Sequence, residues 1–261
     1  MSFEKRIACW IDTQKKCASI TLQTKSTKIR YAANMIYDKK YEKSNIEFYD
    51  MDAINCCLSF APNALVLNLS DDIYAGGCVD VGSGAQEESL FRRTNYFQSL
   101  TQDFYPIRNN EAVYSPQISV IKSSEQTGWE LLTVRPLINF IACPAIKYPT
   151  KIIADGEKRL KPDDVDKLTK KIKLIIQAAL RFNHNTIIFG AMGCGAWRNP
   201  PKHVAQIFKD VLQECDGFIQ NYYFAIMSSV GDGDSQKDKN INIFKEVFES
   251  TASMAIEYKC L

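Results

Sequence analysis

The residues Tyr74-Ala-Gly-Gly-Cys-Val-Asp-Val-Gly-Ser-Gly-Ala-Gln-Glu-Glu-Ser-Leu-Phe-Arg-Arg-Thr94 run from a glycine-rich loop into an amphipathic helix. They follow Ala64–Leu69, a short apolar run of mostly branched aliphatic side chains that is bounded by polar residues. Such a run indicates a buried strand. The glycines between Gly76 and Gly84 free the backbone to adopt positive φ and to approach a ligand closely. A strand, a glycine loop and a helix N-terminus in this order present free backbone N–H groups, which suit an anion such as phosphate.

Side-chain spacing predicts where this helix begins. Ser83 and Gln86 have the Ser-x-x-Gln spacing of a capping box, and Glu87 and Glu88 then fall in the first turn. The apolar positions of the predicted helix are Leu90, Phe91, Phe97 and Leu100. Arg92 and Arg93 are expected on its solvated side, and contact with a bound phosphate is the alternative for them. Acidic residues in a first turn also complement the helix dipole, so a purely structural explanation stays open for this segment by itself.

A second loop of the same kind lies near residue 190. The predicted strand Asn185–Phe189 opens into Gly190-Ala-Met-Gly-Cys-Gly-Ala-Trp-Arg-Asn-Pro-Pro201, and a helix is predicted over Lys202–Glu214. Proline is tolerated best in the first turn of a helix, which agrees with this boundary. A plain glycine turn between strand and helix is the alternative.

The rest of the chain alternates strands with helices. Strands are predicted at Asn45–Tyr49, Leu137–Ala142 and Tyr222–Met227, with strand character at Ala18–Leu22; helices are predicted at Phe3–Lys15, Met51–Phe60, Pro162–Phe182 and Ile241–Phe248. This alternation predicts an α/β fold with a mostly parallel or mixed sheet covered on both faces. Ligands in such folds bind outside the carboxyl ends of the strands, where both glycine loops emerge.

Three connecting segments receive more specific predictions. Within the irregular stretch 105–137, Ala112–Pro116 and Ile118–Ile121 are expected to pair as a β-excursion, and Lys147–Lys161 is expected to be a polar insert. Asp50 is the predicted N-cap of the helix near residue 51. The segment 231–239 is predicted to be a solvated loop without a calcium site, because Asp232-Gly-Asp234 lacks the other ligands of a calcium loop.

Composition limits the partners. The 261 residues are 46% hydrophobic, which suits one large domain, and 32 basic against 30 acidic side chains give no general field for nucleic acid or an anionic membrane. No apolar run approaches the roughly 20 residues that span a bilayer. We therefore expect no direct nucleic-acid or membrane partner, and a monomer.

The cysteines and histidines indicate the compartment and exclude a metal site. Nine cysteines without a Cys-x-x-Cys pair, behind an N-terminus that lacks a signal-peptide core, are typical of reduced thiols in a cytoplasmic or nuclear protein. His184 and His203 have no cysteine or carboxylate at ligand spacing, so no metal is expected.

The ordered set of motifs resembles the macrodomain of the microbial-type poly(ADP-ribose) glycohydrolase family. That family has a strand ending Asn-Phe-Ala, then Gly-Gly-Gly, six to eight residues, and Gln-Glu-Glu. The counterparts here are Asn68-Leu-Ser70, Gly76-Gly-Cys78 and Gln86-Glu-Glu88. Two departures are Cys78 at the third glycine, where a side chain crowds the distal end of the ligand, and Asp71, where the family often has asparagine or a small polar residue.

The second loop extends the resemblance. The family has Gly-Ala-x-Gly-Cys-Gly-Ala-Phe-x-Asn-Pro-Pro, and this chain differs in its aromatic residue, Trp197; Tyr114-Ser-Pro116 also matches a family element. The resemblance covers roughly residues 46–248. It implies a macrodomain-like, three-layer α/β/α fold with a mixed, mostly parallel central sheet. Residues 46–261 are then the catalytic domain, and residues 1–45 are an N-terminal extension packed on it.

The resemblance also implies an ADP-ribose site. Backbone amides of the second loop are expected to surround the diphosphate and the distal ribose, and the implied ligand-binding set is Asp71, Gly76, Gly77, Cys78, Gln86, Gly193, Cys194, Gly195, Ala196 and Trp197. Three of these keep an alternative: Asp71 binds a ribose hydroxyl or only caps its loop, Trp197 lies over the distal ribose or packs beside the proline turn, and Gln86 has a structural role. The acidic residue that receives the adenine is not assigned.

The implied chemistry is hydrolysis at the anomeric carbon of the distal ribose, without a cofactor. By resemblance, Glu88 is the general acid that then becomes the base, and Glu87 orients the leaving ribose. A helix N-terminus favours ionised glutamate, whereas a general acid at neutral pH needs a raised pKa. Burial and substrate phosphates favour the protonated form, and the sequence does not decide which effect is larger.

We therefore expect an ADP-ribosyl glycohydrolase that acts on poly- or mono-ADP-ribosylated protein. The first alternative is a macrodomain that binds ADP-ribose without cutting it, because Cys78 or Asp71 spoils the geometry. A second is a hydrolase that removes only single marks. An unrelated nucleotide-binding protein is disfavoured because the chain has no Gly-x-x-x-x-Gly-Lys-Ser/Thr loop.

Overall fold

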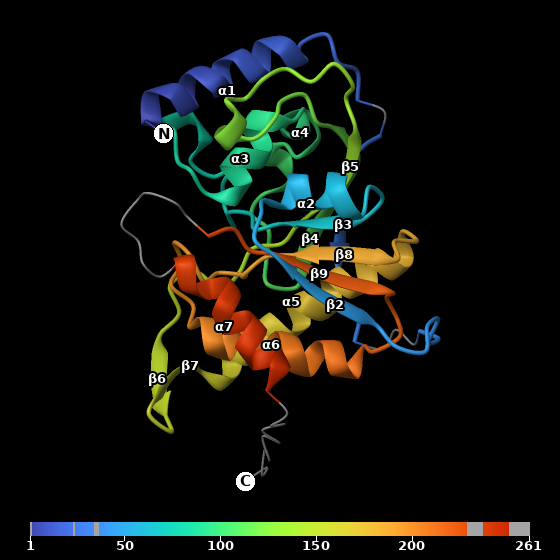
Figure 1. The fold of residues 1–261 in the computed structure, drawn as a ribbon, viewed down its shortest axis with the longest axis vertical. Helices are drawn as coiled ribbons and strands as arrows, with labels where there is room; N and C mark the ends of the chain where they lie inside the picture. The colour runs from blue at the N-terminus through green and yellow to red at the C-terminus, as the bar shows by residue number, and fades with distance from the viewer. Residues whose placement is uncertain (1, 23, 34–36, 229–236, 251–261) are drawn as a thin grey trace.

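A seven-stranded sheet lies between two layers of helices in the computed structural model (Figure 1), which describes residues 2–22, 24–33, 37–228 and 237–250. The strand order is β1-β4-β5-β3-β8-β9-β2, and among these seven strands β4 alone runs antiparallel to the other six. The strands are β1 (Thr27–Arg30), β2 (Asn45–Tyr49), β3 (Leu65–Asn68), β4 (Glu111–Ser119), β5 (Leu137–Ala142), β8 (Thr186–Phe189) and β9 (Asn221–Ala225). The mixed, mostly parallel sheet expected from the sequence is confirmed.

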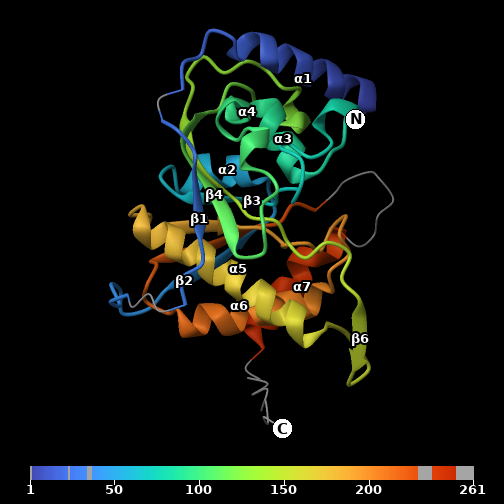
Figure 2. The same cartoon turned by 180° about the vertical axis from the view of Figure 1, so that it is seen from behind.

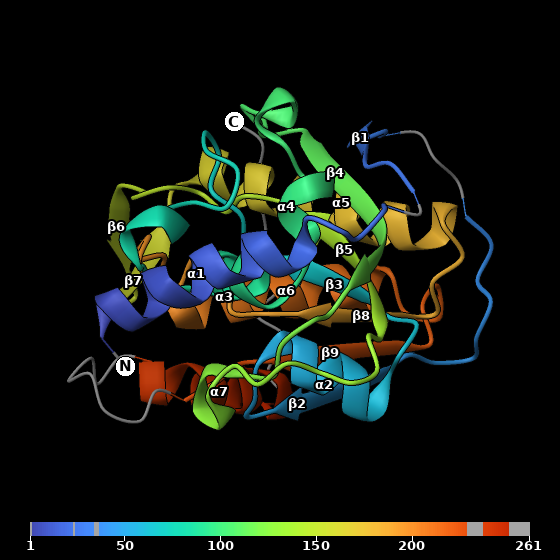
Figure 3. The same ribbon diagram turned by 90° about the horizontal axis from the view of Figure 1, so that it is seen from above.

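Helices cover both faces of the sheet, as Figures 2 and 3 show from behind and from above. One layer holds α1 (Phe3–Cys17), α2 (Ala53–Phe60), α3 (Gln86–Arg93) and α4 (Tyr96–Ser99), and the other holds α5 (Pro162–Arg181), α6 (Pro201–Glu214) and α7 (Lys237–Glu249). A small hairpin, β6 (Lys151–Ala154) and β7 (Glu157–Leu160), projects beside α6 and α7. The 3₁₀ turns are η1 (Val79–Val81), η2 (Gln102–Phe104) and η3 (Glu125–Thr127). Among the described helices, none is both long and apolar enough to cross a bilayer.

The central strands separate two apolar cores. Along β3, Leu65 and Leu67 pack toward α5 and α6, whereas Val66 packs toward α2 and α3. Every residue of β3 and β8 is buried. Strands buried on both faces appear in a sequence as continuous apolar runs, which is why these two were predictable.

Two predicted strand features are wrong. Residues 18–22 form no strand; the strand of this region is β1, whose register on β4 pairs Thr27 with Tyr114. The segments near Ala112 and Ile118 do not pair with each other but lie in the single strand β4, which is irregular between Ser115 and Ile118 where it pairs with β5. These pairings join residues far apart in the chain, so local patterns do not reveal them. The polar insert 147–161 contains the hairpin β6–β7.

Two predicted helix caps are also wrong. The N-cap of α3 is Ala85, without a side-chain bond, so Ser83 and Gln86 form no capping box; α3 ends at Arg93, and Phe97 lies in α4. Asp52, not Asp50, caps α2 by accepting a hydrogen bond from the Asn55 amide. Asp50 instead accepts one from the Ser228 amide. Most of the predicted loop 231–239 lies outside the described residues, and the helix predicted at 241–248 falls within α7.

The described part of the first 45 residues belongs to the same unit. β1 is the edge strand of the central sheet, and α1 packs on α3 and on η1. The segment expected as an extension therefore contributes one strand and one helix to the layers that the rest of the chain builds.

Candidate active site

The two glycine loops leave the sheet at neighbouring points. β3 and β8 are adjacent and parallel, with Leu65 opposite Ile187, so their carboxyl ends lie side by side. Lys147, which follows β5 on the other side of β3, connects the loops. Its Nζ lies 3.0 Å from Asp71 Oδ2 of the first loop and 5.4 Å from the ring centre of Trp197 in the second.

Glu87 is buried at the base of the first loop and is held by three donors. Its Oε1 accepts hydrogen bonds from Asn68 Nδ2 and from the Tyr105 hydroxyl, both at 3.1 Å. Its Oε2 accepts one from the Asp71 amide at 2.7 Å. Only 3% of the residue is exposed. Both oxygens therefore already accept hydrogen bonds from the protein, and Oε2, with a single donor, has room for one more.

Burial decides the protonation state of Glu87. Desolvation raises the pKa of Glu87 to about 8, because it outweighs the three hydrogen bonds, which favour the ionised form, and the charge of Glu88 acts in the same direction. Glu87 is thus mostly neutral at pH 7.

Glu88 is also buried, but one of its oxygens is free. Its Oε1 accepts a hydrogen bond from the Cys78 amide at 3.1 Å, whereas its Oε2 is buried and has no hydrogen-bond partner among the described residues. An unpartnered buried carboxylate oxygen is costly unless a ligand or water meets it. Glu88 Oε2 is therefore the atom of the carboxylate pair that remains available to a substrate.

Glycine is required at position 77 by both backbone and space. Gly77 has a φ of +57°, and a Cβ there would stand 2.8 Å from Glu88 Oε1 and 3.3 Å from Glu87 Oε2. Cys78, in contrast, has a φ of −105°, which any residue adopts, and its side chain is exposed. The replacement of the third glycine by Cys78 therefore causes no backbone strain.

Two other predicted ligand residues support the loop. Gln86 Nε2 donates to the Leu67 carbonyl, and its Oε1 accepts from the Leu69 amide at 2.6 Å, so Gln86 closes the end of β3. Gly76 gives room to the ring of Phe91, which a Cβ would meet at 2.5 Å. These contacts agree with the structural alternative for Gln86.

Asp71 caps its own loop and binds Lys147. Its Oδ1 accepts hydrogen bonds from the amides of Ile73 and Tyr74 at 2.8 and 3.0 Å, and its Oδ2 pairs with Lys147. Burial works against ionisation, but the two amides and Lys147 outweigh it and lower the pKa of Asp71. The two alternatives for Asp71 were binding of a ribose hydroxyl and capping of its own loop, and the hydrogen bonds to the Ile73 and Tyr74 amides are those of a cap.

The second loop is closed by Asn199. The side-chain amide of Asn199 donates to the carbonyls of Ile146 and Gly193, at 2.7 and 3.1 Å, and Gly193 has a φ of +75°. The Cys194 amide donates to the Ala191 carbonyl, so it is already engaged. The amides of Gly193, Gly195 and Ala196 have no acceptor within the described part of the chain, and the last two residues are exposed.

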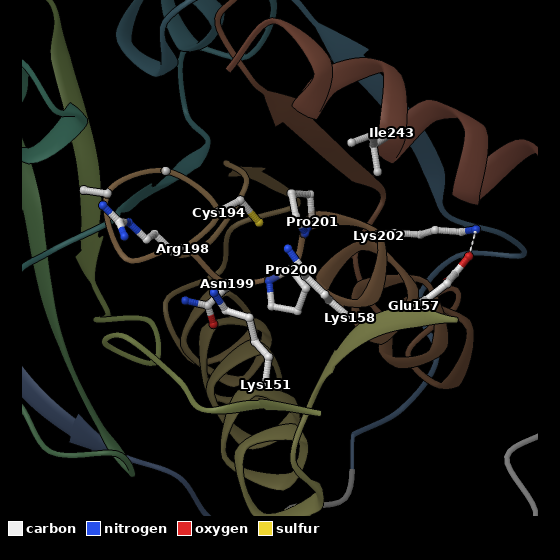
Figure 4. A pocket seen from close by; sticks show the side chains of 12 residues that line it. Lys151, Glu157, Lys158, Cys194, Arg198, Asn199, Pro200, Pro201, Lys202 and Ile243 are labelled. Atoms are coloured by element: carbon white, nitrogen blue, oxygen red, sulfur yellow. Dashed lines mark hydrogen bonds and ion pairs between the residues drawn. The ribbon is translucent and has the colours of Figure 1, made fainter. Parts of the chain in front are cut away.

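A cavity of about 740 Å³ lies between the second loop and the hairpin β6–β7. Figure 4 shows four basic side chains around it, Lys151, Lys158, Arg198 and Lys202, and one acidic residue, Glu157, which pairs with Lys202. Cys194, Gly195 and Ala196 line it, and no residue of the first loop does. A single hollow lined by both loops, as expected from the sequence, thus stays a prediction, while the Lys147 bridge places the loops next to each other.

Sequence reasoning missed several residues of this site. Asn68 was part of the quoted motif, but Tyr105 and Lys147 come from segments without a recognisable pattern and reach the loop only through the fold. Arg92 and Arg93 were expected in solvent and are both buried. Arg93 pairs with Asp52 at 2.7 Å, whereas the Arg92 guanidinium has no hydrogen-bond partner among the described residues. Burial lowers the pKa of Arg92, and the charge of Glu88, one turn before it, opposes this effect.

Helix α1 packs directly on the first loop. Trp10 Nε1 donates to Asp80 Oδ1 at 2.7 Å, and a Cβ at Gly82 would stand 2.6 Å from the Phe3 carbonyl. A Cβ at Gly84 would stand equally close to the Arg6 guanidinium. The later glycines of the loop thus allow α1 to approach, which gives the N-terminal helix a role in positioning the segment before Glu87 and Glu88.

Eight cysteines lie in the described residues, and all eight are free thiols. Only the thiol of Cys78 is exposed among them. The same described residues contain no group of three or more histidine, cysteine or acidic side chains that could hold a metal.

A family model matches part of the chain. Residues 9–123 match the family model of the microbial-type PARG catalytic domain, where PARG is poly(ADP-ribose) glycohydrolase. This segment includes Asn68, the first glycine loop and both glutamates. None of the curated proteins compared matches the chain.

Solved structures share the fold over nearly the whole chain. The PARG of Thermomonospora curvata superposes with a TM-score of 0.74 at 19% identity, covering 94% of this chain and 100% of its own. The same protein bound to the inhibitor ADP-HPD gives 0.72 at 20% identity, with coverages of 93% and 99%. The PARG of Deinococcus radiodurans in complex with ADP-ribose gives 0.65 at 18% identity, with coverages of 95% and 92%. The match over residues 9–123 and the shared fold both agree with the resemblance seen in the sequence to a macrodomain of the microbial-type PARG family.

Proposed function

We propose that the protein is an ADP-ribosyl glycohydrolase that cuts the glycosidic bond at the distal ribose of ADP-ribosylated protein. The observation that carries this proposal is the state of the two neighbouring carboxyl groups. Glu87 is buried, mostly neutral and bonded through both oxygens, whereas Glu88 has one oxygen anchored by the Cys78 amide and one without a partner. The family match over the segment that contains both residues supports the same activity.

The second loop provides the complement for the diphosphate. The acceptor-free amides of Gly195 and Ala196 line a cavity that also holds four basic side chains. Amides that have no protein acceptor bind phosphate oxygens well, and nearby cations strengthen this binding. The diphosphate of ADP-ribose lies against this loop in the proposed complex, which directs the distal ribose toward the first loop.

The reaction then takes two proton transfers at Glu88. Protonated Glu88 gives its proton to the leaving oxygen as the bond from that oxygen to the anomeric carbon breaks through an oxocarbenium-like state. The resulting carboxylate takes a proton from water as the water oxygen attacks the same carbon, which restores protonated Glu88.

Glu87 positions rather than reacts in this mechanism. A neutral Glu87 places no second negative charge beside Glu88, and its contacts with Asn68 and Tyr105 fix the start of α3. Glu87 orients the leaving ribose by hydrogen bonding, as the resemblance implies. Modified proteins as substrates, and a monomeric enzyme, are part of the same proposal.

Replacement of Glu88 by glutamine tests the proposal. Glu88→Gln should abolish release of ADP-ribose from modified protein, a loss of about 10² to 10⁴ for removal of a general acid–base, while calorimetry still detects ADP-ribose binding. The control is Glu130→Gln, an exposed glutamate, which should hydrolyse at the wild-type rate. Wild-type turnover by Glu88→Gln would remove this residue from the mechanism.

A macrodomain that binds without cutting is the second candidate, and the exposed side chain of Cys78 beside the anchor of Glu88 is the observation that favours it. Cys78→Gly discriminates the two. If Cys78 blocks attack, the wild type binds ADP-ribose without releasing product and the glycine variant gains hydrolysis. If the wild type already hydrolyses, the side chain is compatible with catalysis.

A further inference from the structure

Arg92 lies on α3 one turn after Glu88, and its side chain is completely buried. All three of its guanidinium nitrogens are without a hydrogen-bond partner among the described residues. The next residue, Arg93, is almost as deeply buried, but it donates to Asp52 at 2.7 Å and to Asn55 at 2.9 Å. Arg93 therefore joins α3 to α2, whereas no such contact explains Arg92.

A buried guanidinium without a partner destabilises the fold that contains it. Taking a cation out of water is costly, and an apolar side chain of similar length avoids this cost. Buried polar groups that stay unsatisfied in this way are typical of functional sites. Its place one turn from Glu88 indicates that Arg92 belongs to the candidate active site.

The charged groups near the guanidinium leave Glu88 as its counterpart. Burial lowers the pKa of Arg92, and among the neighbouring charges Glu88 opposes this most, followed by Glu125. Arg6, the nearby cation, donates to both carboxylate oxygens of Glu125 at 3.0 to 3.2 Å, so these two charges largely cancel. Cys9 also lies near, and burial raises the pKa of its thiol, which is therefore neutral at pH 7.

Helix geometry directs the Arg92 side chain toward Glu88. Residues four apart on a helix share a face, and long side chains on a helix point back toward its N-terminus. The structure contains no hydrogen bond between Arg92 and Glu88 within its described residues. Arg92 therefore acts on Glu88 through its charge and leaves Glu88 Oε2 available to a substrate.

Helix α1 covers this pair and excludes water from it. The hydroxyl of Thr13 donates to the Arg92 carbonyl, and the thiol of Cys9 also contacts that carbonyl. Thr13 is completely buried, and only 6% of Glu88 is exposed. Charges interact more strongly where water is excluded, because the effective dielectric constant is lower. The guanidinium can therefore influence Glu88 without touching it.

We propose that Arg92 is a positioning residue that stabilises the carboxylate formed when Glu88 gives up its proton. The inference rests on the proposed function and adds a residue to its mechanism. As the bond between the anomeric carbon and the leaving oxygen breaks, the proton moves from Glu88 to that oxygen, and negative charge appears on the carboxyl. A cation that is already fixed nearby stabilises this charge without rearranging during the reaction. Arg92 thus lowers the barrier to bond cleavage.

Two substitutions separate the charge of Arg92 from a structural role. Arg92→Met should have a higher Tm than the wild type, because the buried unpaired charge is gone. Its kcat for release of ADP-ribose from modified protein should nevertheless fall at least about tenfold, with KM within about twofold. Arg92→Lys, assayed at pH 6 so that the amine keeps its proton, should retain kcat within about threefold of the wild type.

Arg93→Met is the matched control for stability. It removes a neighbouring buried guanidinium that is paired with Asp52, so it leaves a carboxylate without its partner. Its Tm should therefore fall, in contrast to that of Arg92→Met.

A second substrate identifies the step at which Arg92 acts. ADP-ribose with a 4-nitrophenyl group on its anomeric oxygen releases a stabilised phenolate, which leaves without taking a proton from Glu88. Turnover of this substrate by Arg92→Met should stay within about threefold of the wild-type rate, because the step that Arg92 assists is bypassed.

The outcomes separate this inference from the proposed function. Wild-type kcat on modified protein in Arg92→Met overturns the role of Arg92, and the proposed function stands if Glu88→Gln is inactive in the same assay. An equal loss on both substrates, or a lower Tm for Arg92→Met, also overturns it, because Arg92 is then a structural residue. A wild type that releases ADP-ribose from neither substrate overturns both proposals.

Discussion

Glu87→Gln should make the stability of this protein less dependent on pH. Glu87 has a pKa of about 8 in the fold and 4.5 as its ordinary value. The native state therefore holds a proton on Glu87 that the unfolded chain has already released. The contribution of this group is fully present below pH 4.5 and is lost as pH rises to about 8.

The magnitude follows from the size of the shift. Each pH unit between these values removes about 1.4 kcal/mol from the free energy of unfolding, which sums to about 5 kcal/mol across the window. Glutamine carries no titrating proton, so this slope disappears in Glu87→Gln. Between pH 5.5 and 7.5 the free energy of unfolding of the wild type should therefore fall by about 3 kcal/mol relative to that of Glu87→Gln.

The groups that donate hydrogen bonds to Glu87 can rearrange around a glutamine side chain. The glutamine NH₂ group donates to the Tyr105 hydroxyl oxygen, and Asn68 turns its side-chain amide so that Oδ1, which has no partner now, faces the glutamine. The comparison is thus between two neutral side chains at low pH and between a neutral and an ionised one at high pH.

Urea denaturation at pH 5.5, 6.5 and 7.5 measures the effect, with Glu130→Gln as the exposed control. Activity should stay within about tenfold of the wild type, because glutamine still donates a hydrogen bond where neutral Glu87 would, whereas Glu88→Gln loses turnover. Parallel stability curves for wild type and Glu87→Gln would refute a buried neutral Glu87.

Three further substitutions test the loop. Gly77→Ala should abolish hydrolysis and lower stability by about 1–3 kcal/mol, because its Cβ meets Glu88 Oε1 at 2.8 Å and its φ is +57°; turnover and urea denaturation measure both. Trp10→Phe, which loses the hydrogen bond to Asp80 but keeps the ring, should lower kcat with little change in fold, as seen by steady-state kinetics and circular dichroism; unchanged kcat would mean that α1 does not position the loop. Lys147→Met, which releases Asp71 and Asp72, should raise the pKa of the Asp71 carboxyl and the KM for substrate, measurable by NMR titration and kinetics.

Local patterns predicted the architecture of this chain well. β3 and β8 are continuous apolar runs because both faces of the sheet are covered, and each is followed by a loop and a helix, so the placement of both loops at one edge was predictable. The errors concern features that depend on distant partners. β1 and β4 form through pairing across tens of residues, and the cap of α3 is absent because Gln86 bonds to the end of β3 instead.

The spacing of Gly76, Gly77, Glu87 and Glu88 is a property of the sequence, because the backbone freedom of glycine and the first turn of a helix are local. Only the tertiary structure decides that Glu87 is the neutral carboxyl, that Glu88 keeps a free oxygen and that Arg92 is buried without a hydrogen-bond partner among the described residues. These properties come from desolvation and from contacts with Tyr105, Asp71 and the residues after β5. Such contacts join segments that are distant in the chain, and they exist only when the fold is complete.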